Sequence, residues 1–160
     1  MNQSNINAFF LNAKPICALK KKNLNKDGDE YVLFFDGCSK GNPGVAGAGA
    51  VIYKNDIEIY CSSVFVGKKE TNNVAEYTGL ISGLQEAVEQ NIKNIIVKGD
   101  SLLVIKQMKG EYQVKAENMM HLYQKAKKLE KMFDSIAYTH VYREHNKRAD
   151  ALSNQAISLR

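Results

Sequence analysis

Four acidic residues in this sequence stand where carboxylates could act together. Asp36 and Asp100 follow apolar runs that should be strands, and Glu76 and Asp150 lie early in stretches with helical spacing. In open α/β sheets, the carboxyl ends of the strands are the usual place for a site. If the two strands are neighbours, all four side chains can meet at one edge of the sheet and form a cluster of negative charge.

Such a cluster calls for cations, because carboxylates that lie together repel one another and raise one another's pKa values. Ligands that are all oxygen suit Mg²⁺ or Mn²⁺. Two ions about 3.5–4 Å apart can activate a water molecule and stabilise the leaving oxygen of a phosphodiester. This chemistry needs no nucleophilic side chain. A hydrolase based on His or Cys is a competing interpretation, but no supporting arrangement surrounds the residues it would use: His121, His140, Cys17 or Cys61.

Each acid also has an ordinary structural interpretation. Asp36 precedes a glycine and could begin a turn, and Asp100 could cap the helix that follows it. Glu76 comes three residues after Asn73, so the two could form a capping box. Asp150 could simply favour the positive end of a helix dipole. Only the shared placement of the four residues favours a site over four separate structural roles.

Small residues beside two of the acids support the functional interpretation. Asp150 lies between Ala149 and Ala151, which leave room for another element. Small residues also follow Glu76 on its predicted helical face at i+3, i+7 and i+11: Gly79, Gly83 and Ala87. They would let the helix approach the sheet closely and direct Glu76 inward.

The elements that must position these acids follow from hydrophobic periodicity and turn signals. The pattern predicts an α/β fold with the order β-β-β-α-β-α-α-β-α, which gives a five-stranded mixed sheet flanked by helices. The first strand should stop at Asp36 and a turn-rich loop should follow, while Asn55-Asp56 predicts a tight hairpin turn. The expected strands are 31–35, 47–54, 57–66, 95–97 and 135–142; the expected helices are 74–88, a short one after residue 100, 116–133 and 146–159.

Composition limits the class of protein. The 160 residues are 44% hydrophobic and 24% charged, which fits one globular domain, and the net charge of +5 makes polyanions plausible partners. Three cysteines without CxxC spacing suit a reducing compartment, and no apolar run is long enough for a membrane span. We expect a domain at 30–160 and, at 1–29, an extension that is partly disordered or packed on the domain edge. Its Lys20–Lys22 cluster is a solvated tail, a phosphate contact or a nuclear signal.

Four sequence blocks together resemble one known family. They are Phe-Asp-Gly-Cys-Ser-Lys-Gly-Asn-Pro-Gly at 35–44, Thr-Asn-Asn-Val-Ala-Glu-Tyr at 71–77, Lys-Gly-Asp-Ser at 98–101 and Asn-Lys-Arg-Ala-Asp-Ala-Leu at 146–152. In this order they closely resemble the successive motifs of type 1 ribonuclease H, and the match covers about residues 30–158. The resemblance implies the ribonuclease H-like fold. It also implies an endonuclease that hydrolyses the RNA strand of RNA–DNA hybrids and leaves 5′-phosphate and 3′-hydroxyl ends.

The resemblance also assigns roles to residues. Asp36, Glu76, Asp100 and Asp150 match the family's metal-binding catalytic tetrad, with Asp36 bridging two Mg²⁺ ions when substrate is bound and Mn²⁺ able to substitute. Recognition should read shape and backbone, including the 2′-hydroxyls of RNA. The matching substrate-binding positions are Gly37, Cys38, Ser39, Asn42, Thr71, Asn72 and Asn73. Double-stranded RNA is left open as a second substrate.

The sequence departs from the better-known bacterial form. A short link, residues 143–148, replaces the longer loop that carries a catalytic His, which resembles the archaeal and plant branch. Arg143 is the first candidate for that auxiliary role and His145 the second. The basic protrusion and the separate hybrid-binding domain are missing. We expect an intracellular, most simply cytoplasmic, monomer with no membrane association and no obligate protein partner. A binding module without catalysis and a piece of a reverse transcriptase are the alternatives.

Overall fold

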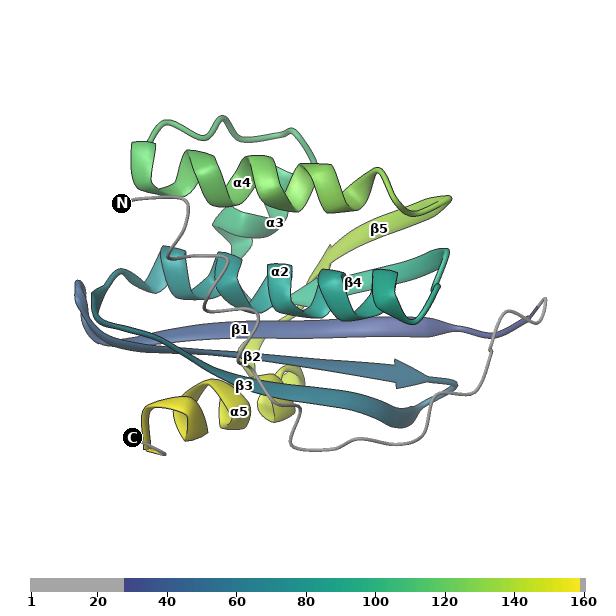
Figure 1. Cartoon of the computed structure of the whole chain (residues 1–160), viewed down its shortest axis with the longest axis horizontal. Coiled ribbons are helices and arrows are strands. Elements are labelled where there is room, and N and C mark those ends of the chain that lie inside the picture. The colour runs from purple at the N-terminus through teal and green to yellow at the C-terminus, as the bar shows by residue number, and fades with distance from the viewer. Residues whose placement is uncertain (1–27, 159–160) are drawn as a thin grey trace.

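The computed structural model describes residues 28–158, which form one sheet with helices on both faces (Figure 1). The sheet has five strands in the order β3-β2-β1-β4-β5. The first three strands are antiparallel neighbours, and β1, β4 and β5 run parallel. The predicted α/β class, mixed sheet and element order are therefore confirmed. The strands are β1 (Tyr31–Gly41), β2 (Gly44–Lys54), β3 (Ile57–Glu70), β4 (Asn94–Gly99) and β5 (Ser135–His140).

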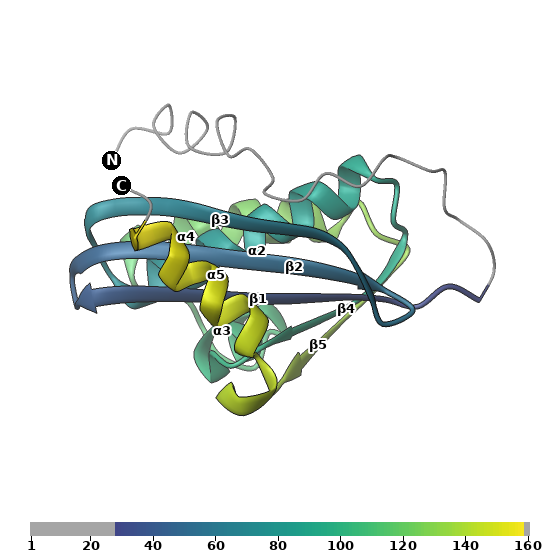
Figure 2. The ribbon, with the colours of Figure 1, turned by 90° about the horizontal axis from the view of Figure 1, so that it is seen from below.

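The helices cover the two faces unequally. Figure 1 shows three of them on one side of the sheet: α2 (Asn72–Glu89), α3 (Leu102–Met108) and α4 (Glu117–Glu130). The opposite side carries α5 (Lys147–Ser158), which follows the short 3₁₀ helix η1 (Arg143–His145) and crosses β1, β2 and β3 (Figure 2). Within residues 28–158, no helix combines the length and apolar character that a membrane span requires.

The unequal cover explains two separate groups of buried apolar side chains. The main core fills the space between the sheet and α2, α3 and α4, and its fully buried members include Leu33, Phe35, Tyr77, Leu80 and Leu84. A smaller cluster lies under α5 and consists of Val51, Cys61, Ala149 and Leu152. Burying a large apolar side chain stabilises a fold by about 1.5–3 kcal/mol, so both clusters hold their helices firmly against the sheet.

The first hairpin is longer than predicted. β1 does not stop at Asp36 but continues to Gly41, and β2 already begins at Gly44, so the loop predicted at residues 37–44 is mostly strand. The small side chains in this segment led to the prediction of a loop. They also suit a strand against which the backbone of a helix packs closely. β3 likewise extends to Glu70 instead of ending at residue 66. The Asn55-Asp56 turn is confirmed, with φ of 48° and 65°.

Two helix caps also differ from the prediction. Thr71, not Asn73, caps α2, because Thr71 keeps an extended backbone and its side chain accepts a hydrogen bond of 3.2 Å from the Val74 N–H. The expected capping box of Asn73 and Glu76 is therefore wrong. Ser101, not Asp100, caps α3 in the same way. A cap must be the last extended residue before the helix, and tertiary structure sets where that residue falls.

The predicted division at residue 29 is only partly visible. The described residues run from Gly28 to Ser158, and the predicted domain at residues 30–160 stays a prediction. The proposed extension at residues 1–29, with its lysine cluster at residues 20–22, lies outside the described residues except for the last two positions.

Candidate metal centre

Three of the four predicted acids meet beside the middle of β1. Asp36, Glu76 and Asp100 each offer an oxygen, and these oxygens all lie within 4.8 Å of one another. The parallel pairing of β1 with β4 ends at Phe35 opposite Gly99, and the residue that follows each of them in the chain is one of the acids. The sheet register therefore places two carboxylates side by side where β4 ends. The argument from strand ends is confirmed for Asp100 but not for Asp36, because β1 continues beyond it.

Glu76 joins them because α2 packs directly on the backbone of β1. A side chain at Gly37 would place its Cβ 2.1 Å from the Glu76 nitrogen, and one at Gly79 would place it 2.5 Å from the Asp36 carbonyl oxygen. Neither position can carry a side chain without moving the helix. The prediction that Gly79 allows a close approach is confirmed, and the result is that Glu76 points into the protein at the edge of the sheet.

The cluster holds more negative charge than the protein compensates. Asp36 and Glu76 are each 4% exposed, and Glu76 Oε2 is a buried oxygen without a hydrogen-bond partner. Burial is the main reason that the pKa of Asp36 is raised to about 7; a hydrogen bond from Ser153 opposes the rise, and the charges of Asp100 and Asp150 add to it. Burial, then Asp36 and Asp100, raise the pKa of Glu76 well above its ordinary value.

A divalent cation fits this donor set. The ligands are hard carboxylate oxygens, which Mg²⁺ and Mn²⁺ prefer, and one of them is buried with its hydrogen-bonding capacity unused. A bound cation would offset the repulsion and the cost of burial that raise these pKa values. The chemistry of the residues is thus consistent with a metal centre formed by Asp36, Glu76 and Asp100.

Asp150 lies at the rim of this centre and is not one of the three clustered ligands. It belongs to the first turn of α5, and its Oδ1 lies 3.3 Å from Arg143 Nη2. Its charge still reaches Asp36, whose pKa it raises. Of the two alanines expected to make room beside it, Ala149 is fully buried against β2, whereas Ala151 is exposed. The fourth metal ligand stays a prediction.

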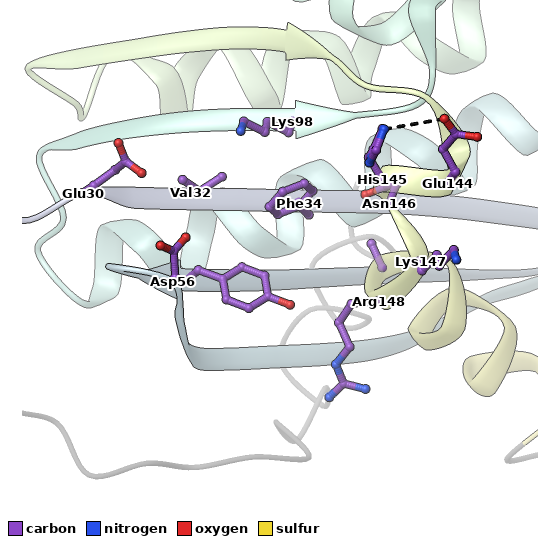
Figure 3. Close-up of a pocket in the computed structure, with 12 residues that line it drawn as sticks. Glu30, Val32, Phe34, Asp56, Lys98, Glu144, His145, Asn146, Lys147 and Arg148 are labelled. Carbon is purple, nitrogen blue, oxygen red and sulfur yellow. Dashed lines mark ion pairs between the residues drawn. The ribbon is translucent and has the colours of Figure 1, made fainter.

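The two auxiliary candidates of the short link lie differently. Arg143 is 77% exposed and forms an ion pair with Asp150, so it stands beside the acidic cluster. His145 Nε2 lies 3.6 Å from Glu144 Oε1, and its side chain lines a separate pocket (Figure 3). Arg143 thus contacts one of the four predicted acids, and the auxiliary role of either residue stays a prediction.

The predicted substrate-binding positions lie on two neighbouring segments, the β1–β2 hairpin and the start of α2, which we call the rim. Asn42, at the tip of the β1–β2 hairpin, accepts a hydrogen bond of 3.0 Å from the Asn72 N–H at the start of α2. Ser39 donates one of 2.8 Å to the Glu70 carbonyl oxygen. These contacts fasten the hairpin to the beginning of α2. The same rim carries the remaining predicted positions: Gly37, Cys38, Thr71 and Asn73.

Comparison with known proteins agrees with this geometry. Residues 34–156 match the profile of the reverse transcriptase-like family. The chain is 39% identical over 130 residues to ribonuclease HI of Halobacterium salinarum. The match covers 81% of this chain and 65% of that protein. The chain belongs to the type 1 ribonuclease H family. It is also 42% identical over 129 residues to the bifunctional protein Rv2228c of Mycobacterium tuberculosis, but spans only 35% of that protein's length.

Solved ribonucleases H have the same fold. The N-terminal RNase H domain of Rv2228c has a TM-score of 0.78 at 42% identity and covers 81% of this chain and 94% of that one. RNase H1 of Halobacterium salinarum also has a TM-score of 0.78, at 36% identity, and the match covers 82% of this chain and 99% of that one. LC11-RNase H1 in complex with an RNA/DNA hybrid has a TM-score of 0.77 at 32% identity, and the match covers 81% of this chain and 98% of that one. The resemblance in the four sequence blocks is confirmed.

Two residues of this chain that were not predicted contact β1 at or beside Asp36. Ser153 of α5 donates a hydrogen bond of 2.6 Å to Asp36 Oδ2. Asn146 Nδ2, just before α5, donates one of 2.9 Å to the Phe35 carbonyl oxygen. Both partners are more than 100 residues away in sequence, so no local pattern reports these contacts. The available signal was the position of Ser153, one helical turn after Asp150.

The chain also has a concave region on the α5 side of the sheet. A pocket of about 400 Å³ lies between β1, β4 and the start of α5 (Figure 3). Phe34 forms its floor, with the Tyr53 ring edge-on at 5.8 Å and Lys98 Nζ 5.6 Å from the ring centroid. At its margin, Arg148 makes two hydrogen bonds of 2.9 and 3.0 Å to Glu58. Arg148 and Glu58 therefore compensate each other's charge at this margin.

Proposed function

We propose that this chain is a metal-dependent endonuclease that hydrolyses the RNA strand of RNA–DNA hybrids and leaves 5′-phosphate and 3′-hydroxyl ends. The observation that carries the proposal is the convergence of Asp36, Glu76 and Asp100 on one point, with a buried Glu76 oxygen that has no partner. Support comes from the related ribonuclease HI of Halobacterium salinarum and from LC11-RNase H1, which was solved with an RNA/DNA hybrid.

The proposed cofactor is Mg²⁺, with Mn²⁺ able to substitute and two ions per site when substrate is bound. Asp36, Glu76 and Asp100 would hold it, and Asp150 would complete the set from the rim. When bound, the metal supplies an activated water and stabilises the leaving oxygen of the phosphodiester. The chain's own contribution is to bury Asp36 and Glu76 and to keep them close to Asp100, so that the ionised forms of these carboxylates depend on the cation.

The proposed substrate surface is the rim formed by the β1–β2 hairpin and the start of α2. Main chain at residues 37–39 would lie along 2′-hydroxyls in the minor groove, and the side chains of Asn42, Thr71, Asn72 and Asn73 would contact sugars, base edges and a DNA phosphate. Backbone contacts of this kind position a duplex without reading its sequence. Arg143, which is exposed beside Asp150, would assist turnover or product release.

A parallel cleavage assay tests the proposal. RNA–DNA hybrid, double-stranded RNA and single-stranded RNA, each labelled on one RNA strand, are incubated with Mg²⁺, with Mn²⁺ and with EDTA. We expect cleavage of the hybrid with either metal and none with EDTA. The family resemblance leaves open whether double-stranded RNA is also cleaved, and this part of the assay decides it. Binding of hybrid without cleavage in either metal would overturn the proposal in favour of a non-catalytic binding module.

The working state that we infer is a monomer inside the cell without an obligate protein partner. The two cysteines within the described residues, Cys38 and Cys61, are not joined by a disulfide, which suits a reducing compartment. Size-exclusion chromatography coupled to light scattering tests the monomer, since a mass near 17.9 kDa is expected for one chain. Cleavage activity in the purified chain alone tests the independence from partners.

A further inference from the structure

We propose that Ser153 is a positioning residue for Asp36: its buried hydroxyl holds one oxygen of this carboxylate, so that Asp36 is presented to a divalent cation in one orientation. The inference rests on the proposed function, because that function places Asp36 at the metal. Ser153 follows the last of the four family-like sequence blocks and is neither acidic nor a ligand itself.

The contact is short and enclosed. Ser153 Oγ lies 2.6 Å from Asp36 Oδ2, and Ser153 is fully buried. A distance of this size is typical of a hydroxyl that donates to an ionised carboxylate. Burial excludes water as a substitute donor, so the loss of this hydroxyl would leave the Asp36 oxygen without its partner.

The Ser153 proton has one competing acceptor, which another residue satisfies. Ser153 Oγ also lies 2.9 Å from the Asp150 carbonyl oxygen. A hydroxyl has a single proton to donate. Asn154 Nδ2 donates to the same carbonyl at 2.9 Å, so this oxygen has a partner of its own. The charged Asp36 carboxylate is the stronger acceptor, and the Ser153 proton is therefore directed to it.

The helix that carries Ser153 is held in place by its backbone. A Cβ at Gly47 would lie 2.3 Å from the Ser153 carbonyl oxygen, and one at Gly49 would lie 2.6 Å from the Ala149 carbonyl oxygen. Ser63 of β3 adds a hydrogen bond of 2.6 Å to the Leu152 carbonyl oxygen. α5 therefore rests directly on β2, which fixes the position of the hydroxyl relative to β1.

The hydrogen bond from Ser153 therefore orients the Asp36 carboxylate before a metal ion binds. Glu76 and Asp100 supply the other oxygens of the cluster, and neither acid can donate a hydrogen bond when it is ionised. Ser153 is the side chain that donates to Asp36 within the described residues. Partners that orient a ligating carboxylate change metal affinity by about 10–100-fold when they are removed, so we expect Ser153 to act on metal binding and not on the recognition of nucleic acid.

The test measures Mn²⁺ binding to the protein without substrate, from the electron paramagnetic resonance signal of the free ion. Ser153→Ala should bind Mn²⁺ about tenfold more weakly than the unaltered chain. Ser63→Ala is the matched control, because it removes a side-chain hydrogen bond of the same 2.6 Å length from the neighbouring residue of α5 without touching Asp36. We expect its affinity for Mn²⁺ to be unchanged.

Two further measurements separate positioning from a general loss of structure. Thermal unfolding in EDTA should show that both alanine variants fold, and binding of RNA–DNA hybrid in EDTA should be the same in both. Ser153→Cys, which keeps a weaker donor, should have an intermediate Mn²⁺ affinity, and it replaces the alanine variant if that one does not fold.

The outcomes distinguish this inference from the proposed function. Equal Mn²⁺ affinity in Ser153→Ala and the unaltered chain would overturn the role of Ser153 alone. Equal weakening in Ser153→Ala and Ser63→Ala would also overturn it, because α5 as a whole would then be the cause. An unaltered chain that binds no Mn²⁺ would overturn the metal centre and the proposed function with it.

Discussion

Two regions that both contact α5 surround their acidic side chains with opposite electrostatic environments. On β3, Glu58 accepts two hydrogen bonds from Arg148, which hold its pKa below the ordinary value. In the middle of β1, burial raises the pKa of Asp36 to about 7, with Ser153 as the opposing donor. The first acid is compensated by the protein, whereas the second belongs to a cluster that no ion pair within residues 28–158 joins to a basic side chain. A carboxylate paired in this way stabilises packing, and a cluster left uncompensated indicates a ligand from outside.

The region of the Arg148–Glu58 ion pair nevertheless helps to position residues at the acidic cluster. Arg148 and Glu58 tie the first turn of α5 to β3, and this same helix carries Ser153 to Asp36. The ion pair therefore adds to the backbone contacts with β2 that hold this helix in place. This division between compensated and uncompensated charge can be tested by substitution, by pH and by added Mg²⁺.

The largest effect is expected for Asp36→Asn. Removing this charge should lower the rate of hybrid cleavage by at least about a thousandfold, because stabilisation of charge by the metal is worth several kcal/mol. Binding of hybrid in EDTA should be retained, since the shape hardly changes. Glu58→Gln makes the same chemical change at the paired acid and should keep most of the activity. Similar losses in the two variants would remove the distinction between the two regions.

Arg143→Ala should have a smaller effect on cleavage. Arg143 contacts Asp150 at the rim and is largely exposed, so its loss should slow turnover by about tenfold, within the range for partners of a metal ligand. The rate under saturating hybrid is the quantity to measure. His145→Ala, which changes the neighbouring side chain that lines the pocket, is the control and should leave the rate unchanged. A loss as large as that of Asp36→Asn would make Arg143 a principal catalytic group.

The stability of the metal-free protein should depend on pH through Asp36. Its pKa is raised from 3.8 to about 7 in the folded protein, so the folded state binds a proton more tightly than the unfolded state. Stability from this group is therefore greatest below about pH 4 and is lost as pH rises towards about pH 7. In EDTA, the melting temperature of the unaltered chain should fall relative to that of Asp36→Asn by several degrees between these limits.

Added Mg²⁺ provides the complementary measurement. Because the cation binds the ionised carboxylates, it should raise the melting temperature more at pH 8 than at pH 5. Asp36→Asn should show a smaller increase at both values. An increase that is independent of pH would show that Mg²⁺ stabilises the protein at sites other than this cluster.

The smallest effect is expected for Arg148→Ala. Its ion pair with Glu58 is partly exposed, with 45% of the arginine side chain accessible, so the loss of stability should be about 0.5–1 kcal/mol. Urea unfolding measures it. Cleavage should fall only slightly, because α5 keeps its backbone contacts with β2. A much larger loss of activity than of stability would show that Arg148 acts on the substrate and not only on the helix.

Local patterns predicted a large part of this structure. Positive-φ residues at Asn55 and Asp56 form the expected tight turn, and Gly79 lies against β1 as the inward direction of Glu76 required. The prediction failed where a local pattern had two solutions. Small residues after Asp36 suit a loop and also suit a strand packed against helix backbone, and Thr71 and Asn73 are both good cap residues. In each case the packing of distant elements selected one solution.

The sequence by itself determined the order of the elements, the identity of the four acids and their place beside strand and helix ends, because periodicity and turn chemistry are local properties. Tertiary structure decided which acids lose their protein partners. Asp100 and Glu76 are free of the capping roles that their neighbours suggested, because Ser101 and Thr71 cap the helices. Tertiary structure alone also brings Ser153 to Asp36, since the two are 117 residues apart and meet only when α5 packs across the sheet.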